Sequence, residues 1–193
     1  MTEPLDAHRA LVAKVDAWVA QVAARRASDM RCRAGCDACC HTRLTVSPVE
    51  AALVRDAVAR LSEGERAELA ERAARPELAH RCVMLRADGR CAIYEARPLV
   101  CRTQGLPLRY PAGLVPEATV RARAKGGEIT WCPLNFEARP PDGDDVLDAE
   151  RLDTLLALTN RAFVAAQGGD PLERVELAAL LLRTAGGLRT AGG

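Results

Sequence analysis

Residues 32–50 read CRAGCDACCHTRLTVSPVE, a cysteine-rich run that passes directly into the start of a helix. Three of its cysteines, Cys36, Cys39 and Cys40, fall within five positions, and Gly35 before them lets the backbone turn sharply. Two cysteines separated by two residues can direct both sulfurs at one ion, so this spacing recurs in zinc and iron–sulfur sites. The run therefore predicts a metal-binding loop.

Helices are predicted on both sides of this run. Ser47 and Glu50 stand three residues apart, the spacing of a capping box, and Ser62 and Glu65 repeat it. Apolar residues at steps of three and four mark other helices, because such steps place side chains on one helical face. The predicted helices cover about residues 5–27, 47–61, 62–75, 146–167 and 171–184.

Residues 76–145 contrast with these helices. They hold eight prolines and four of the eight cysteines, which predicts a mostly irregular segment with one short turn or helix near 93–103. A long irregular segment inside a compact domain is usually functional. The sequence thus predicts a mainly α fold, with a small helical scaffold around a cysteine-rich, loop-dominated metal-binding region. We expect one domain over 1–184 with its cysteine-rich core at 31–132, followed by a disordered tail at 185–193.

The composition narrows the classes of function. A chain of 193 residues, 49% of them apolar, is long enough to bury a core. Its net charge of +1 gives no electrostatic case for nucleic acid or an anionic membrane, so neither is expected as a partner, while a protein partner stays open. No leader-like segment and no long apolar stretch is apparent, which predicts a soluble, cytoplasmic protein. In such a reducing compartment, clustered cysteines indicate metal or redox chemistry more often than structural disulfides.

The later cysteines stand far apart in the sequence and are weaker signals one by one. A single cysteine such as Cys32 or Cys132 is often only a small buried apolar residue. That explanation is poor for the whole set, because the chain uses alanine freely elsewhere. The first choice of ligands is Cys36, Cys39 or Cys40, Cys91 and Cys101, with Cys82 next. The full set of candidate metal ligands is Cys32, Cys36, Cys39, Cys40, Cys82, Cys91, Cys101 and Cys132.

Two stretches resemble a known family. Residues 35–50 and, more specifically, residues 82–102 with their Cys-x-Ile-Tyr-Glu-x-Arg-Pro core resemble the CxxCxxCC family, also called the YkgJ family, of zinc- or iron-chelating proteins. The resemblance covers about residues 31–103 and implies that cysteine thiolates hold zinc or iron. The family name implies two residues between the first and second cysteines. This chain has three there, so Cys32 is the weakest match.

Three functions stay open at this level. The first is a zinc- or iron-chelating protein. The second is an iron–sulfur protein acting in redox chemistry, in electron transfer or as an accessory enzyme; the family includes a cysteine-rich region of flagellin lysine N-methylases, which implies such a cluster. The third is an interaction module in which zinc is structural. No catalytic residue is assigned, and the sequence does not decide whether the chain is an enzyme.

Charged neighbours are expected to tune the cysteines. Arg97 and Arg102 are predicted to donate to thiolates or lower their pKa, and the alternative for Arg97 is a clamp on a nearby carboxylate. Histidines are not expected as ligands. His41 directly follows a cysteine, which makes joint ligation awkward, and His8 and His80 are predicted to lie at the surface.

Overall fold

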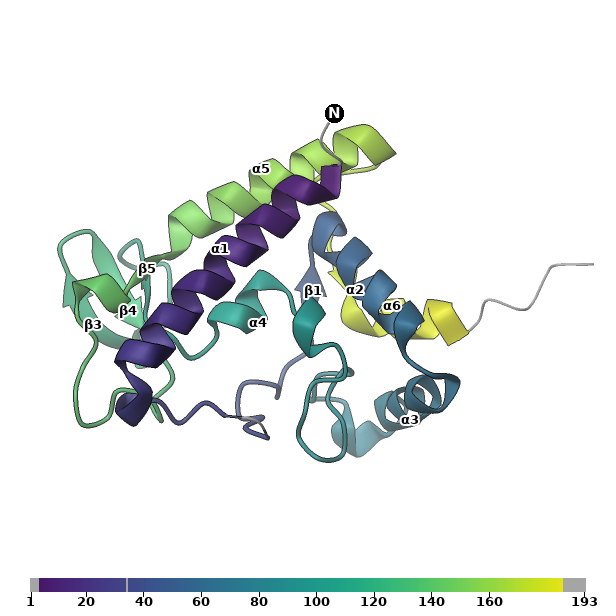
Figure 1. Cartoon of the computed structure of the whole chain (residues 1–193), viewed down its shortest axis with the longest axis horizontal. Coiled ribbons are helices and arrows are strands. Elements are labelled where there is room, and N and C mark those ends of the chain that lie inside the picture. The colour runs from purple at the N-terminus through teal and green to yellow at the C-terminus, as the bar shows by residue number, and fades with distance from the viewer. Residues whose placement is uncertain (1–3, 34, 186–193) are drawn as a thin grey trace, which may run out of the picture. The chain divides into compact units, whose positions relative to one another are not determined.

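The structure is a computed structural model that describes residues 4–33 and 35–185. The fold is mainly helical (Figure 1), as the sequence predicted. The predicted disordered tail beyond residue 185 lies outside the described residues. Within those ranges, no helix combines the length and the apolar character needed to cross a bilayer. The α-helices are α1 (Pro4–Arg25), α2 (Pro48–Arg60), α3 (Glu63–Ala73), α4 (Leu99–Thr103), α5 (Ala149–Gln167) and α6 (Leu177–Ala185).

Both predicted capping boxes are present. The backbone N–H and the hydroxyl of Ser47 donate to Glu50 Oε2 over 3.1 and 2.8 Å, and α2 begins at the next residue. At α3, Ser62 N–H donates to Glu65 Oε2 over 2.9 Å, while Glu65 N–H returns a 3.2 Å bond to the Ser62 hydroxyl. These bonds satisfy N–H groups that a helix start leaves without partners, which is why the two starts could be predicted from local sequence.

Residues 76–145 are mostly turns and loops with short helices at Tyr94–Ala96 and Leu99–Thr103, as predicted, but they also contain strands that the sequence did not predict. The strands β2 (Leu108–Tyr110), β3 (Val120–Ala124) and β4 (Gly127–Thr130) lie here, and β5 (Leu147–Asp148) follows. Their order is β3-β4-β2-β5, with antiparallel pairs except for the parallel pair of β2 and β5. The prolines that suggested a loop stand outside these strands. Lys125 and Gly126 form the turn between β3 and β4, and Gly126 and the first residue of β4, Gly127, have positive φ of +100° and +144°.

The start of the last helix was predicted wrongly. Asp170 accepts the backbone N–H of Leu172 on its side chain at 2.8 Å, and its carbonyl accepts Glu173 N–H at 3.1 Å. These bonds form a turn instead of a helix start, which is the other structure that aspartate favours. The chain then forms β6 (Val175–Glu176), which pairs antiparallel with β1 (Thr45–Val46), and α6 begins only afterwards.

The chain divides into two compact units, each assembled from two separate stretches. Unit 1 comprises Met1–Arg33 and Leu99–Ala162, and unit 2 comprises Ala34–Pro98 and Phe163–Gly193. In unit 1, α1 lies beside α5 (Figure 1), and Leu11, Val15, Leu99 and Leu152 form a buried cluster.

His8 belongs to this packing, which corrects its predicted surface position. Only 2% of the residue is exposed, and its Nδ1 lies 3.3 Å from Thr159 Oγ1 on α5. His8 stands three residues before Leu11 and therefore shares its buried helical face. The helical spacing of His8 and Leu11 in the sequence could therefore have predicted that His8 is buried.

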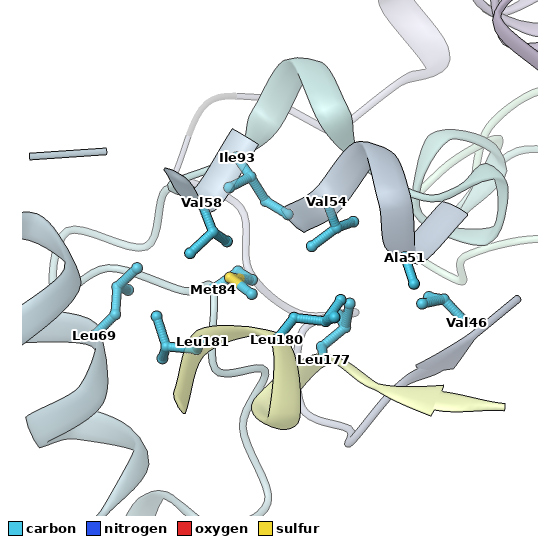
Figure 2. Close-up of a cluster of buried hydrophobic side chains, with 10 residues drawn as sticks. All are labelled: Val46, Ala51, Val54, Val58, Leu69, Met84, Ile93, Leu177, Leu180 and Leu181. Atoms are coloured by element: carbon cyan, nitrogen blue, oxygen red, sulfur yellow. The ribbon is translucent and has the colours of Figure 1, made fainter. Parts of the chain in front are cut away.

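Unit 2 is built around a cluster of buried aliphatic side chains (Figure 2). Helix α2 contributes Val54 and Val58, and α6 contributes residues that face them across the cluster. Met84 and Ile93, from the cysteine-bearing segment between α3 and α4, lie among them. The helices therefore fix that segment through its apolar residues. The whole cluster comprises Val46, Ala51, Val54, Val58, Leu69, Met84, Ile93, Leu177, Leu180 and Leu181.

Candidate metal centre

Cys82 and Cys91 lie on a short hairpin of unit 2, residues 82–92, which we call the cysteine hairpin. Leu85 N–H donates to the Cys82 carbonyl over 3.1 Å, and Leu85 pairs with Cys91 in an isolated antiparallel bridge. Ala92 N–H donates to the Met84 carbonyl over 2.8 Å. These bonds bring together two cysteines that are nine positions apart in the sequence.

Residues 35–40, which we call the cysteine loop, contact this hairpin at both ends. At one end, Cys82 N–H donates to the Cys40 carbonyl over 2.8 Å. At the other end, a β-carbon on Gly89 would lie 3.0 Å from the Gly35 carbonyl oxygen, and both glycines have positive φ. Only glycine allows so close a backbone approach in this conformation. The intervening stretch, which carries two more cysteines, is therefore held against the hairpin.

Asp37 links the cysteine loop to the residues around it through both its backbone and its side chain. Its carbonyl accepts Cys40 N–H at 2.8 Å, and its Oδ2 lies 3.2 Å from Arg81 Nη1. The same oxygen is 3.8 Å from His41 Nε2, and the His41 ring stands 5.8 Å from that of His80. His80 is exposed, as the sequence predicted. These polar contacts stabilise the turn that carries Cys40.

Neighbouring thiols raise the pKa of two cysteines of unit 2, Cys39 and Cys82. A hydrogen bond with Cys40 raises the pKa of Cys39, and burial adds to this effect. Burial raises the pKa of Cys82, and the charges of Cys91 and Cys39 raise it further. Burial likewise raises the pKa of Cys91. Because like charges oppose joint ionisation, a cation among these sulfurs would favour their thiolate forms.

Other groups around these sulfurs favour the thiolate form. The backbone N–H of Met84 hydrogen-bonds Cys82, and that of Ile93 hydrogen-bonds Cys91, and each bond lowers the pKa of its thiol. In both cases the donor stands two residues after the cysteine. The charge of Arg97 lowers the pKa of Cys91 and of one thiol in the cysteine loop. Such donors orient sulfur ligands and tune the metal they hold.

The donor set fits a thiophilic metal. Thiolate sulfur favours zinc and iron–sulfur clusters, and a bound cation deprotonates a coordinating thiol outright. Among the residues that the structure describes, no three His, Cys, Asp or Glu side chains are arranged to hold one ion together. The structure therefore shows a gathering of thiols in unit 2 and not a closed ligand cage.

Hollows open beside both hairpin cysteines. One, of about 20 Å³, is lined by Cys82 together with Arg43, Arg72 and Arg81 and has room for about one water molecule. The other, of about 370 Å³ and more open to solvent, is lined by Cys91 and the residues that follow it. The second hollow leaves the surroundings of Cys91 open to solvent.

The eight cysteines are divided between the two units. Cys101 lies on α4 of unit 1, and in the same unit Cys32 and Cys132 both approach Gly105. All eight are thiols in this structure. The cysteines of unit 2 are Cys36, Cys39, Cys40, Cys82 and Cys91, and those of unit 1 are Cys32, Cys101 and Cys132.

The two arginines of the second signature have different surroundings. The Arg97 guanidinium lies 3.5 Å from the centre of the Tyr94 ring, and its Nε donates to the Tyr94 carbonyl over 3.0 Å. Its effect on thiol pKa agrees with the sequence-based expectation. Arg102 is largely buried, and its Nη1 donates to both carboxylate oxygens of Asp16 on α1 over 2.7 and 2.6 Å.

Sequence reasoning missed the groups that organise the site. The backbone donors at Met84 and Ile93 leave no signature in residue type. Asp37 looked like an ordinary member of the cysteine run. The Asp88-Gly89 pair did carry a signal, because this dipeptide is typical of tight hairpin turns.

Comparison with known proteins agrees with the chemistry of this site. Neither the curated proteins nor the solved structures gave a match. A family model does match, over 95 of the 193 residues, and the matched stretch contains every cysteine except Cys132. Residues 31–125 match the family described as "CxxCxxCC: Putative zinc- or iron-chelating domain", which supports a metal-binding role.

Proposed function

We propose that this chain is a zinc- or iron-chelating protein whose metal is held by thiolates of the cysteine loop and the cysteine hairpin. The first choice of ligands within unit 2 is Cys36, Cys39 or Cys40, Cys82 and Cys91. The match of residues 31–125 to a metal-chelating family supports the proposal. So does the resemblance of residues 82–102 to the YkgJ family.

The attachment of the loop to the hairpin is the observation that carries the proposal. The 2.8 Å bond between Cys82 N–H and the Cys40 carbonyl joins segments that are about forty residues apart in the sequence. The rise that Cys91 and Cys39 cause in the pKa of Cys82 supports the same grouping, because it requires these thiols to lie near one another. Thiolates bind metal only while they stay reduced, so the proposal includes a reducing, cytoplasmic setting.

An iron–sulfur cluster is the second candidate occupant. The grouped donors are all sulfur, and hydrogen bonds from Met84 and Ile93 to the sulfurs are of the kind that tunes cluster potential. Elemental analysis and visible absorption of anaerobically purified protein separate the two candidates. A coloured protein that bleaches on reduction supports a cluster, and a colourless protein with stoichiometric zinc excludes it.

Single substitutions test the ligand assignment. We expect Cys82→Ser and Cys91→Ser each to lower the metal content per chain sharply, because each removes a thiolate from the grouped set. Cys132→Ser is the matched control, since this residue lies outside the matched stretch. Cys101→Ser tests the sequence-based choice of that residue. Unchanged metal content in both Cys82→Ser and Cys91→Ser would refute the assignment.

A further inference from the structure

Cys32 and Cys132, which the proposed metal centre does not use, approach each other in unit 1. An added β-carbon on Gly105 would lie 3.1 Å from Cys32 Sγ and 3.4 Å from Cys132 Cβ. The distance between Cys32 Sγ and Cys132 Cβ therefore cannot exceed the sum of these two distances. Gly105 has φ of +87° and no side chain, which allows both to sit against it.

The buried side chain of Asn135 holds this arrangement. Its Nδ2 donates to Cys32 Sγ over 3.2 Å and to the Gly105 carbonyl over 2.8 Å. Its Oδ1 accepts the backbone N–H of Arg31 at 2.8 Å, so its amide can face only one way. Asn135 is 0% exposed. A fully bonded buried amide therefore presents an N–H donor to the sulfur of Cys32.

The backbone that carries Cys132 is also fixed. Cys132 N–H donates to the Gly105 carbonyl over 3.3 Å, and Asn135 N–H donates to the Cys132 carbonyl over 2.9 Å. Phe136 has the unusual φ of 56°, and its N–H donates to the Asp29 carbonyl over 2.8 Å. The two cysteines thus belong to segments that are tied to each other through Asn135.

The two thiols differ in access. Cys32 is exposed, whereas Cys132 is partly buried. The exposed thiol is the one that a solute reaches first, so we assign Cys32 as the attacking thiol, which reacts as its thiolate. The partly buried thiol is positioned as the second reactant.

We propose that Cys32 and Cys132 are a redox-active dithiol that exchanges with low-molecular-weight disulfides, separate from the metal-holding thiols. The Cys32 thiolate attacks a sulfur of the small disulfide, forming a mixed disulfide and releasing one small thiolate. The Cys132 thiolate then attacks Cys32 Sγ, forming the Cys32–Cys132 bond and releasing the second. The protein loses two electrons and two protons, and the small disulfide becomes two thiols.

The test uses the reduced, metal-loaded full chain incubated with oxidised glutathione. Thiols are then alkylated, and peptic peptides are identified by mass spectrometry. We expect a Cys32–Cys132 crosslink in the wild type, a lasting mixed disulfide on Cys32 in Cys132→Ser, and an alkylated Cys132 in Cys32→Ser. Cys32→Ala serves as a second variant if the serine variant melts at a lower temperature.

Three outcomes would overturn the proposal. One is a lasting mixed disulfide on Cys32 in the wild type, and another is a crosslink from Cys32 to Cys36 or Cys101. The third is loss of metal from both the Cys32 and the Cys132 variants, which would make them ligands. The test of the Cys32–Cys132 disulfide is independent of the proposed function, because its outcome does not depend on whether unit 2 binds metal.

Discussion

Arg97 carries a positive charge that acts on two thiols of unit 2. It lowers the pKa of Cys91 and of Cys39, and its stacking on Tyr94 holds the guanidinium in position. Without this charge the two thiol pKa values rise, so protons compete more strongly with the metal. We expect Arg97→Gln to weaken metal affinity about tenfold at neutral pH, a typical effect for a group that supports ligands.

Competition with a chelator of known affinity, repeated across pH, checks this expectation. The loss of affinity should shrink as pH rises, because both proteins then hold deprotonated thiols. Arg90→Gln is the matched control, since Arg90 is exposed and pairs with Asp88 at 3.8 Å. Equal losses in the two variants at every pH would contradict a specific role for Arg97.

At the scale of single residues, the sequence identified the candidate ligands better than their arrangement. Cysteine spacing and the second signature name the residue type that we propose as ligands, because metal ligation depends on side-chain chemistry. Contacts such as Gly35 with Gly89 join positions far apart in the chain, and no local pattern encodes them. The burial of His8 was the exception, since its helical spacing from Leu11 was readable.

Among the structural elements, the four-stranded sheet depends on a close backbone approach at Gly127. A β-carbon there would clash with the Tyr110 carbonyl oxygen on the neighbouring strand β2, and φ is +144°. We expect Gly127→Ala to lower the free energy of unfolding by about 1–3 kcal/mol, through strain and displacement of β2. Urea denaturation measures the change.

Gly64 in α3 offers the opposite case with the same substitution. An added β-carbon there meets nothing within 4 Å, and the backbone is helical. Gly64→Ala should therefore raise the free energy of unfolding, by up to about 1 kcal/mol, because alanine favours helix. A higher free energy of unfolding in Gly127→Ala would contradict the close approach of Gly127 to Tyr110, and a lower one in Gly64→Ala would contradict the prediction for α3.

Helix α3 is linked to the cysteine hairpin by a carboxylate with a shifted pKa. Glu65 Oε1 lies 2.5 Å from Arg86 Nη2, and this contact, with bonds from Ser62, lowers the pKa of Glu65 from 4.5 to about 2. The folded-state pKa is thus below the unfolded-state value. The stabilisation is present above pH 4.5 and is lost as pH falls through about 2.

A Glu65→Gln variant should therefore be less stable than the wild type near neutral pH. The gap between the two should narrow over that acidic window, as measured by urea denaturation at a series of pH values. Glu63→Gln, in the same first turn of α3, controls for the general effect of removing a negative charge there. A gap that stayed constant down to the lowest pH would rule out Glu65 as its source.

The elements also show where local sequence stops being informative. The starts of α2 and α3 were predictable because each capping box lies within four residues. The pairing of β1 with β6 joins residue 45 to residue 176, and Asp170-Pro171 resembles a helix start as much as a turn. The glycine pair at 126 and 127 did signal the β3–β4 hairpin, but the surrounding prolines favoured a loop.

For the whole molecule, metal removal should act unevenly, because the proposed centre lies in unit 2. We expect a chelator to lower hydrogen-exchange protection in residues 36–40 and 82–92, where metal bonds would replace regular structure. Strands β3 and β4 of unit 1 should keep their protection. Hydrogen exchange with mass spectrometry resolves these segments, and equal loss in β3 and β4 would contradict a centre confined to unit 2.

The interleaved composition of unit 2 has a consequence for its synthesis. Helix α6 is translated about eighty-five residues after Cys91. Three of its residues pack in one cluster with Met84 of the cysteine hairpin: Leu177, Leu180 and Leu181. Because translation proceeds at about 5–20 residues per second, several seconds pass between the synthesis of the hairpin and that of α6. During that interval the nascent thiols are open to any oxidant or wrong metal, so loading of the correct ion is best timed after the chain is released.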